Sequence, residues 1–164
     1  MRTVEPFVIS RVFDAPRGRV WAAWTEVERL KQWFSPAGFT VIAAKMDLRP
    51  GGSYHYGMRT PTGQEMWGKW TFHEIKAPER LVLVNSFSDA AGGITRHPMA
   101  PTWPLEMQST TTFAEQGGKT TLTLEWLPIN ASAVEIATFE AGRAGMTIGW
   151  TGTMEQLTGY LQKG

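Results

Sequence analysis

The chain of 164 residues contains no cysteine. This absence excludes disulfides, thiolate nucleophiles and zinc sites built on cysteine, and it fits a reducing compartment. Long apolar runs are also absent, since no stretch approaches the roughly 18 continuous apolar residues that a membrane span needs. Residues 1–10 lack the apolar segment of a secretion signal. We therefore expect a cytoplasmic protein with no membrane span.

An excess of charge of either sign is missing as well. Sixteen Lys and Arg residues stand against fifteen Asp and Glu residues, which leaves a formal net charge of +1. A protein that neutralises many phosphates needs a basic surface, so nucleic acid is not an expected partner. The length suits one domain covering residues 1–164, because a domain typically has about 100 to 200 residues.

Seven segments have the alternation or composition of β-strands, and turn residues separate most of them. Such short separators, for example Pro50-Gly51-Gly52 and Gln116-Gly117-Gly118, favour antiparallel hairpins over parallel crossovers. The expected strands are residues 7–13, 39–46, 53–59, 65–75, 81–87, 105–113 and 120–126.

Helices are expected after the first strand and at the end of the chain. Asp14 can cap a first short helix, and Thr25 with Glu28 forms the pattern of a capping box for a second. A further capping box, Ser132 with Glu135, opens the C-terminal helix. Its apolar stripe consists of Met146, Trp150, Met154, Leu157 and Leu161.

Five glycines between residues 142 and 159 lie inside this C-terminal helical segment. A bend near Gly142, or close packing of the helix on the sheet, would explain them. The fold class we predict is α+β. A curved antiparallel sheet of six to seven strands carries two short helices after its first strand, and the long C-terminal helix packs across it.

Aromatic residues are abundant, with eight Trp, eight Phe and three Tyr beside eight Met. Those that share strand or helix faces would line a space between sheet and helix, where Met supplies adaptable walls. Residue by residue, the alternative is ordinary core packing. The candidates for the pocket are Tyr54, Tyr56, Met66, Trp70, Phe72, Met107, Trp126, Met146 and Trp150.

The segment 89–104 has no periodicity, and loops of this length in compact domains are usually functional or disordered. Its prolines and apolar residues favour an ordered flap over the cavity mouth. In that interpretation Arg96 or His97 faces an anionic or hydrogen-bonding group of the ligand, and Trp103 is a further lid residue. The alternative is a loop that serves packing or a dimer contact.

Catalytic and metal-binding motifs are not evident. The three histidines form no helical metal motif, and no Gly-x-Ser-x-Gly elbow is present. We expect neither a metal nor a cofactor. An enzyme would need only one perturbed group in a dry cavity, for which Glu65, Glu106 and His55 are the candidates.

Several short motifs resemble one known family. They include Val12-Phe13-Asp14-Ala15-Pro16 with Val20-Trp21, then Trp33, and Asp47-Leu48-Arg49-Pro50-Gly51-Gly52. They continue with Pro78-Glu79-Arg80-Leu81, the segment 118–124, and Gly149-Trp150 followed by Leu157 and Leu161. With these motifs the chain resembles a bacterial single-domain member of the activator of Hsp90 ATPase homologue (AHSA) family, within the START-like (SRPBCC) superfamily. The resemblance implies the helix-grip fold (START/Bet v-like) with an internal cavity.

Three functions remain open. The favoured one is non-catalytic binding of a small hydrophobic or aromatic molecule between the sheet and the C-terminal helix. The second is a co-chaperone or other protein-interaction module, which the resemblance to ATPase activators implies. The third is a cyclase-like or hydrolase-like enzyme. An exposed edge of the sheet could also pair in a homodimer.

Overall fold

The computed structural model describes residues 4–163 of the chain. Along these residues the elements follow in an order of one strand, two helices, seven strands and two helices. They are β1 (Phe7–Phe13), α1 (Arg17–Thr25), α2 (Val27–Leu30), β2 (Thr40–Met46), β3 (Ser53–Arg59), β4 (Glu65–Lys76), β5 (Arg80–Ser88), β6 (Ile94–Thr95), β7 (Glu106–Gln116), β8 (Lys119–Ile129), α3 (Ala133–Ala141) and α4 (Arg143–Gln162).

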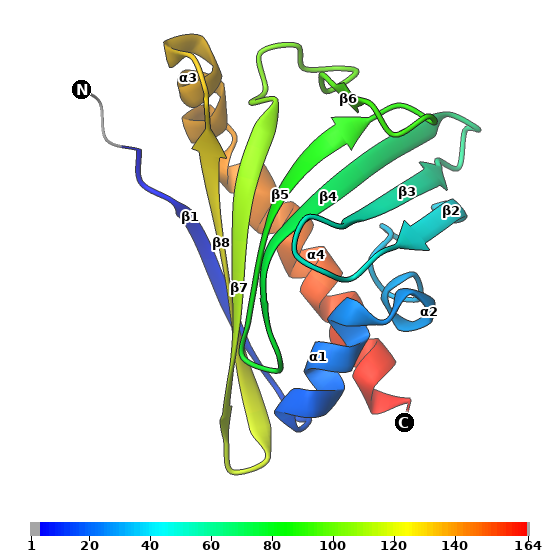
Figure 1. Cartoon of the computed structure of the whole chain (residues 1–164), viewed down its shortest axis with the longest axis vertical. Coiled ribbons are helices and arrows are strands. Elements are labelled where there is room, and N and C mark those ends of the chain that lie inside the picture. Colours follow the sequence, from blue (N-terminus) through cyan, green and yellow to red (C-terminus); the bar gives the residue numbers. More distant parts are fainter. Residues whose placement is uncertain (1–3, 164) are drawn as a thin grey trace.

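The strands form one antiparallel sheet in the order β1-β8-β7-β5-β4-β3-β2, and β6 pairs only with β5. The sheet curves around α4, which crosses its concave face, with α1 near one end and α3 near the other (Figure 1). The predicted α+β helix-grip fold is confirmed. The short strand β6 was not predicted, because two residues are too few to show an alternation.

Alternation along the strands decides which side chains enter the core. In β8, Leu122 and Leu124 are fully buried, whereas Thr121 before them and Glu125 after them are exposed. The strands β7 and β8 run further than predicted, since Gln116 still pairs with Lys119. Gly117 and Gly118 make this possible, because their φ angles of 60° and 79° form a two-residue hairpin turn that other residues rarely adopt.

The predicted caps of the first two helices are wrong. α1 begins after Pro16, and no side chain caps it, so Asp14 does not serve as its cap. Thr25 is the last residue of α1, and its Oγ1 donates a hydrogen bond to the carbonyl oxygen of Trp21 at 2.8 Å. A hydroxyl turned back into its own helix cannot cap the next one, and α2 likewise has no side-chain cap.

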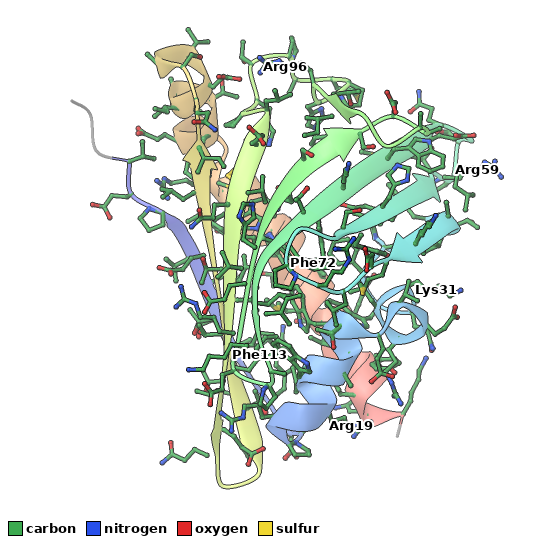
Figure 2. The ribbon with its side chains drawn as sticks, in the orientation of Figure 1. Arg19, Lys31, Arg59, Phe72, Arg96 and Phe113 are labelled. Carbon is green, nitrogen blue, oxygen red and sulfur yellow. The ribbon has the colours of Figure 1, made fainter. Side chains whose placement is uncertain are left out.

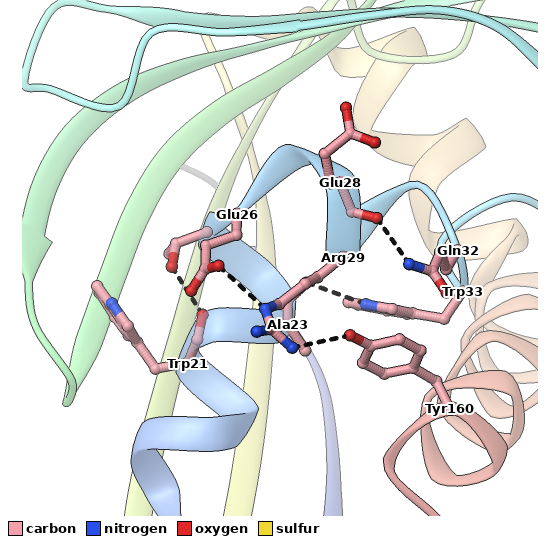
Figure 3. Close-up of polar contacts among 9 residues, drawn as sticks. Trp21, Ala23, Glu26, Glu28, Arg29, Gln32, Trp33 and Tyr160 are labelled. Carbon is pink, nitrogen blue, oxygen red and sulfur yellow. Dashed lines mark hydrogen bonds and ion pairs between the residues drawn. The ribbon is translucent and has the colours of Figure 1, made fainter. Parts of the chain in front are cut away.

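Polar contacts tie α1, α2 and α4 together at one end of the sheet (Figure 3). The indole nitrogen of Trp33 donates to the carbonyl oxygen of Ala23 at 3.0 Å. Arg29 donates to Glu26 at 3.0 Å and to the hydroxyl of Tyr160, on α4, at 3.3 Å. These contacts join the two short helices to each other and to the C-terminal helix.

The C-terminal helical segment is divided at Gly142 into α3 and α4, as the predicted bend requires. Ser132 and Glu135 form the predicted capping box of α3. All five residues of the predicted apolar stripe of α4 are buried. Close packing does not explain the other helical glycines, because a Cβ atom at Gly145, Gly149, Gly152 or Gly159 would meet nothing within 4 Å.

One part of the core lies toward the lower end of the sheet in Figure 2, where Phe113 is labelled. Phe113 on β7 is 2% exposed and meets Trp21 edge to face, with ring centroids 5.2 Å apart. Leu157 of α4 is fully buried in the same cluster. This end of the molecule holds the helix firmly against the sheet.

Candidate functional site

A cavity of about 350 Å³ lies between the concave face of the sheet and the first half of α4. Two of its lining residues are exposed, Pro36 before β2 and Gly149 on α4, so the cavity reaches the surface between them. The lining consists of Trp24, Phe34, Pro36, Phe39, Tyr56, Met58, Met66, Trp67, Gly68, Trp70, Leu83, Asn85, Ser86, Phe87, Trp103, Pro104, Ser109, Trp126, Met146, Gly149, Trp150 and Thr153.

Flat indole rings from four different elements form much of the wall. Trp24 lies within 14° of parallel to Trp150 and within 25° of parallel to Trp70, with centroids 6.1 Å apart in both pairs. Trp126 meets Trp150 edge to face at 5.5 Å. Because α1, β4, β8 and α4 each contribute a ring, the shape of the cavity depends on the tertiary fold.

Tyr56 on β3 lies flat over Gly68, its partner on β4. A Cβ atom at Gly68 would lie 2.3 Å from the Tyr56 ring, so only glycine leaves room for this arrangement. Phe34 packs edge to face on the same tyrosine at 5.5 Å. Burial raises the pKa of Tyr56 to about 12, so the hydroxyl stays protonated across the physiological range.

The polar side chains of the lining are neutral. Asn85 contributes an amide, Tyr56 adds a phenol, and three aliphatic hydroxyls come from Ser86, Ser109 and Thr153. Within residues 4–163, no Asp, Glu, His, Lys or Arg side chain lines this cavity. The site can therefore donate and accept hydrogen bonds, but it offers no charge to balance an ionic ligand.

Two indole N–H groups of the lining are shielded from solvent and lack a hydrogen-bond partner within residues 4–163. They belong to Trp24 and Trp126. A buried donor left without an acceptor typically costs about 1 to 3 kcal/mol. The wall of the cavity thus contains donors that the chain itself does not satisfy.

Six of the nine pocket candidates proposed from the sequence line the cavity: Tyr56, Met66, Trp70, Trp126, Met146 and Trp150. The other three, Tyr54, Phe72 and Met107, do not line it.

Those three residues pack behind the wall as core side chains, each about 1% exposed. Tyr54 stacks on Tyr56 at 5.0 Å, and Phe72 contacts Trp70 edge to face at 6.4 Å. They share the inward face of their strands with the lining residues but lie where other side chains cover them. The alternation along a strand shows which side chains point inward. It does not show which of these side chains line the cavity and which pack behind the lining.

The segment 89–104 is tied down along its length and reaches the cavity only through Trp103 and Pro104. Arg96, at the top of Figure 2, pairs with Glu135 at the start of α3. The Ser132 backbone N–H and, after it, the Arg96 guanidinium lower the pKa of Glu135. Arg96 therefore anchors the loop to α3 and does not face the cavity.

His97 also holds the loop in place and lies outside the cavity lining. Its ring packs on Phe87 at 4.5 Å, and its Nδ1 accepts a hydrogen bond from the backbone N–H of Met99 at 3.0 Å. Burial lowers the pKa of His97, which favours the neutral ring. The segment is an ordered strap, with its last two residues forming one rim of the cavity.

The residues considered for catalysis do not reach the cavity. His55 stacks on Trp67 at 5.2 Å, and its Nε2 lies 2.9 Å from the carbonyl oxygen of Asp89. Glu65 is exposed, and its Oε1 accepts a hydrogen bond from the indole of Trp67 at 3.0 Å. Glu106 is likewise not part of the lining.

Several lining residues were not predicted, and some carried a signal in the sequence. Gly68 interrupts a strand pattern, which commonly marks a close approach of another group. Asn85 and Ser109 place polar groups on otherwise apolar inward faces, which is how a pocket differs from a core. Trp24 and Phe34 come from helical segments, and nothing in the strand pattern places them beside the sheet.

Within residues 4–163, no three His, Asp or Glu side chains are grouped so that they could hold a metal ion. In the same range, no helix combines the length and the apolar character needed to cross a membrane.

The fold and the cavity together define a START-like helix-grip protein. The family model described as "Activator of Hsp90 ATPase homolog 1-like protein" matches residues 14–162. The chain belongs to this family, and the resemblance of its motifs is confirmed. No curated protein gives a significant match to the sequence.

Solved structures of bacterial proteins share the fold. Protein Ms6760 from Mycobacterium smegmatis is 23% identical, with a TM-score of 0.76, covering 94% of this chain and 88% of its own. Protein NE0264 from Nitrosomonas europaea is also 23% identical at a TM-score of 0.76, covering 99% and 97%. A protein from Arthrobacter aurescens is 26% identical at 0.76, covering 100% and 91%.

Proposed function

We propose that this protein binds a neutral, flat and largely apolar small molecule in the cavity between the sheet and α4, without catalysing a reaction on it. The observation that carries the proposal is a wall of near-parallel indole rings in a space that no charged side chain of residues 4–163 lines. Family membership is consistent with ligand binding, and it is equally consistent with a role beside a chaperone.

The size of the cavity supports a compact ligand. Small-molecule pockets usually enclose about 300 to 1,000 Å³, so a cavity of about 350 Å³ lies at the lower end of that range. An apolar cavity of about 150 Å³ binds benzene. A molecule of two or three fused rings is therefore a better match than a long lipid.

The absence of charge in the lining supports a neutral ligand. Transferring an unpaired ion into an apolar site is strongly unfavourable. The side chains of Asn85, Ser109 and Thr153 can instead direct one or two hydrogen bonds to a carbonyl or hydroxyl group. A ligand acceptor that reaches Trp24 or Trp126 would also satisfy an indole donor that the chain leaves unpaired.

The mouth of the cavity gives the ligand a route of entry. Gly149 faces open space, and a side chain added there would grow at the rim of the cavity without striking the protein. Gln156 fixes the opposite rim, because its Nε2 donates to the carbonyl oxygens of Trp33 and Ser35 at 2.7 and 2.6 Å. Entry therefore needs no unfolding of the sheet.

The test is a thermal-shift and fluorescence titration with neutral polycyclic aromatics, matched carboxylated analogues, fatty acids and sterols. A ligand present at 100 times its dissociation constant adds about 2.7 kcal/mol to the free energy of unfolding. We expect a dose-dependent rise in Tm and quenching of tryptophan fluorescence with the neutral polycyclic compounds, and a weaker response to their carboxylated analogues.

Two glycines of α4 provide a matched pair of variants. Gly149→Leu places an isobutyl group at the rim, whereas Gly152→Leu places the same group on the exposed surface of the same helix, outside the lining. We expect the first variant to weaken binding at least tenfold and the second to leave it unchanged. Equal binding by both variants would contradict the cavity as the site.

A chaperone-related role is the second candidate, favoured by the family description alone. It predicts that the chain changes the ATP turnover of a purified Hsp90-type chaperone. No ligand response across the panel, together with such a change in turnover that both glycine variants retain, would replace the proposal.

A further inference from the structure

The two edges of the sheet differ in how they are protected. β2, at one edge, contains a register shift between Val41 and Ala43, and Lys45 is exposed on it. A bulge and an exposed lysine are two devices that keep an edge strand from pairing with another chain. β2 is therefore a protected edge.

β1, at the opposite edge, has neither device. All seven of its residues pair with β8 in unbroken register, and the strand contains no proline, glycine or lysine. The figure shows it as the outermost strand on the left of the sheet (Figure 1). Val8 and Val12 are 51% and 59% exposed on its outer face. A long, regular edge with exposed apolar side chains is a template for a further strand.

The sequence of β1, Phe-Val-Ile-Ser-Arg-Val-Phe, is nearly the same when read in either direction. Its burial pattern is symmetric as well, with buried ends and exposed positions 8, 10 and 12. An antiparallel pair of two such strands centred on Ser10 places Val8 opposite Val12 of the other copy and Phe7 opposite Phe13. The valine, phenylalanine and serine positions thus each meet a residue of their own kind.

Charge does not oppose this arrangement. Arg11 would face Ile9 of the other copy, so no two like charges lie directly opposite one another. Arg11 also points across the inner face toward Glu155 of α4 in its own chain, at 3.5 Å. The two guanidinium groups near the symmetry axis are therefore each accompanied by a carboxylate.

We propose that β1 pairs antiparallel with β1 of a second copy of this chain, about a two-fold axis through Ser10, to form one continuous sheet across the dimer. A closed two-fold interface of this kind uses the same patch on both copies. The axis stands perpendicular to the sheet, so both cavities open on the same side of the dimer. Backbone hydrogen bonds between the two strands would fix the register. Val8 and Val12 of each copy would pack against Val12 and Val8 of the other copy on the outer face.

A matched pair of double variants tests the predicted register. Val8→Lys/Val12→Lys places lysines opposite one another across the interface, whereas Val8→Lys/Val12→Glu places each lysine opposite a glutamate. Both variants keep the new lysine at position 8 beside Glu125, its partner on β8, and place the second substitution opposite Thr121. Sedimentation velocity over a concentration series should show a dimer for the wild type and for the Lys/Glu variant. The Lys/Lys variant should dissociate at least tenfold more readily.

The absence of cysteine allows a second test. Ser10→Cys puts a lone thiol on the axis, opposite its own copy, whereas Val12→Cys puts it two residues away on the same face. Lys45→Cys places it on the protected edge. Mild oxidation should cross-link the Ser10 variant rapidly and the other two slowly.

Circular dichroism of each variant confirms that it has folded before it is compared. The proposal is overturned by a wild type that remains monomeric over the series, or by equal dissociation of the Lys/Lys and Lys/Glu variants. It is also overturned when Lys45→Cys cross-links as fast as Ser10→Cys, since that result assigns the interface to the opposite edge.

Discussion

The two halves of the contact between α4 and the sheet are built from one helix and one set of strands, yet one half is packed and the other is hollow. Met154, Leu157 and Leu161 of α4 lie in the packed half and are at most 6% exposed. Trp150 and Met146, one turn and two turns before Met154 on the same stripe, border the cavity. The helix presents large side chains along its whole length.

The difference therefore comes from the sheet. Opposite the packed half, the strands carry Phe113, Leu122 and Leu124, all at most 2% exposed. Opposite the hollow half, the corresponding inward positions include Ser109 and Gly68. The small side chain of Ser109 leaves space there, and Gly68 makes room for the Tyr56 ring. Large aromatic side chains from both the helices and the strands enclose the cavity. The comparison predicts that truncation is most harmful in the packed half and that enlargement is tolerated only in the hollow half.

The largest effect is expected for Phe113→Ala in the packed half. Truncation of a fully enclosed phenylalanine in a core typically costs about 3 to 5 kcal/mol of unfolding free energy. Phe113 also loses its edge-to-face contacts with Trp21 and Trp24, at 5.2 and 6.3 Å. Urea denaturation followed by circular dichroism measures the change. A loss of less than about 1 kcal/mol would show that this end of the core is loosely packed.

Trp150→Ala should cost less than its size suggests, about 3 kcal/mol, at the lower end of the range for large aromatic side chains. One side of this ring already borders the cavity, so fewer contacts are lost there. The stacked contact with Trp24 and the edge contact with Trp126 are lost in full. The same denaturation experiment decides the order, and a larger loss for Trp150→Ala than for Phe113→Ala would reverse the comparison.

Two nearby positions on β7 allow the same substitution to be compared in the packed half and in the hollow half. Thr111 and Ser109 share the inward face two residues apart, and both are nearly fully buried. Thr111→Leu forces extra volume into the packed half and should cost about 1 to 3 kcal/mol. Ser109→Leu grows into the cavity, should cost less than about 1 kcal/mol, and should abolish ligand binding. Similar losses of stability in both variants would mean that the cavity cannot accept a side chain.

The sequence predicted the strands and the buried face of α4, but it did not predict where the cavity lies between them. Alternation along strands and the stripe on α4 report which side chains point inward, so seven strands and the buried helical face could be predicted. A cavity depends on which inward positions are left small, and on residues that arrive from other elements. Trp24 and Phe34 belong to helical segments whose docking on the sheet is a long-range result. For the same reason Tyr54, Phe72 and Met107 could not be distinguished from true lining residues.

Helix caps were also difficult to predict at the start of the chain. A capping residue works only when the preceding element ends before it. Thr25 and Glu28 have the right spacing, but α1 extends through Thr25 and the hydroxyl bonds within it. Ser132 and Glu135 have the same spacing and do form the box, since the preceding strand ends before them. The spacing was equally good in both places, and only the extent of the preceding element separated them.

The smallest expected effect is on the pH dependence of the unfolding free energy. It tests whether water is excluded from the Tyr56 hydroxyl in the hollow half, as it is from the packed half. Burial raises the pKa of Tyr56 to about 12, whereas a phenol in the unfolded chain ionises near 10. Between about pH 10 and pH 12 the unfolded state therefore binds fewer protons than the folded state, and the free energy of unfolding falls as pH rises. Tyr56→Phe should reduce this slope, measured by urea denaturation across that range. An unchanged slope would mean that water entering through the mouth already hydrates the hydroxyl, which would make the wall beside Gly68 a wet surface unsuited to an apolar ligand.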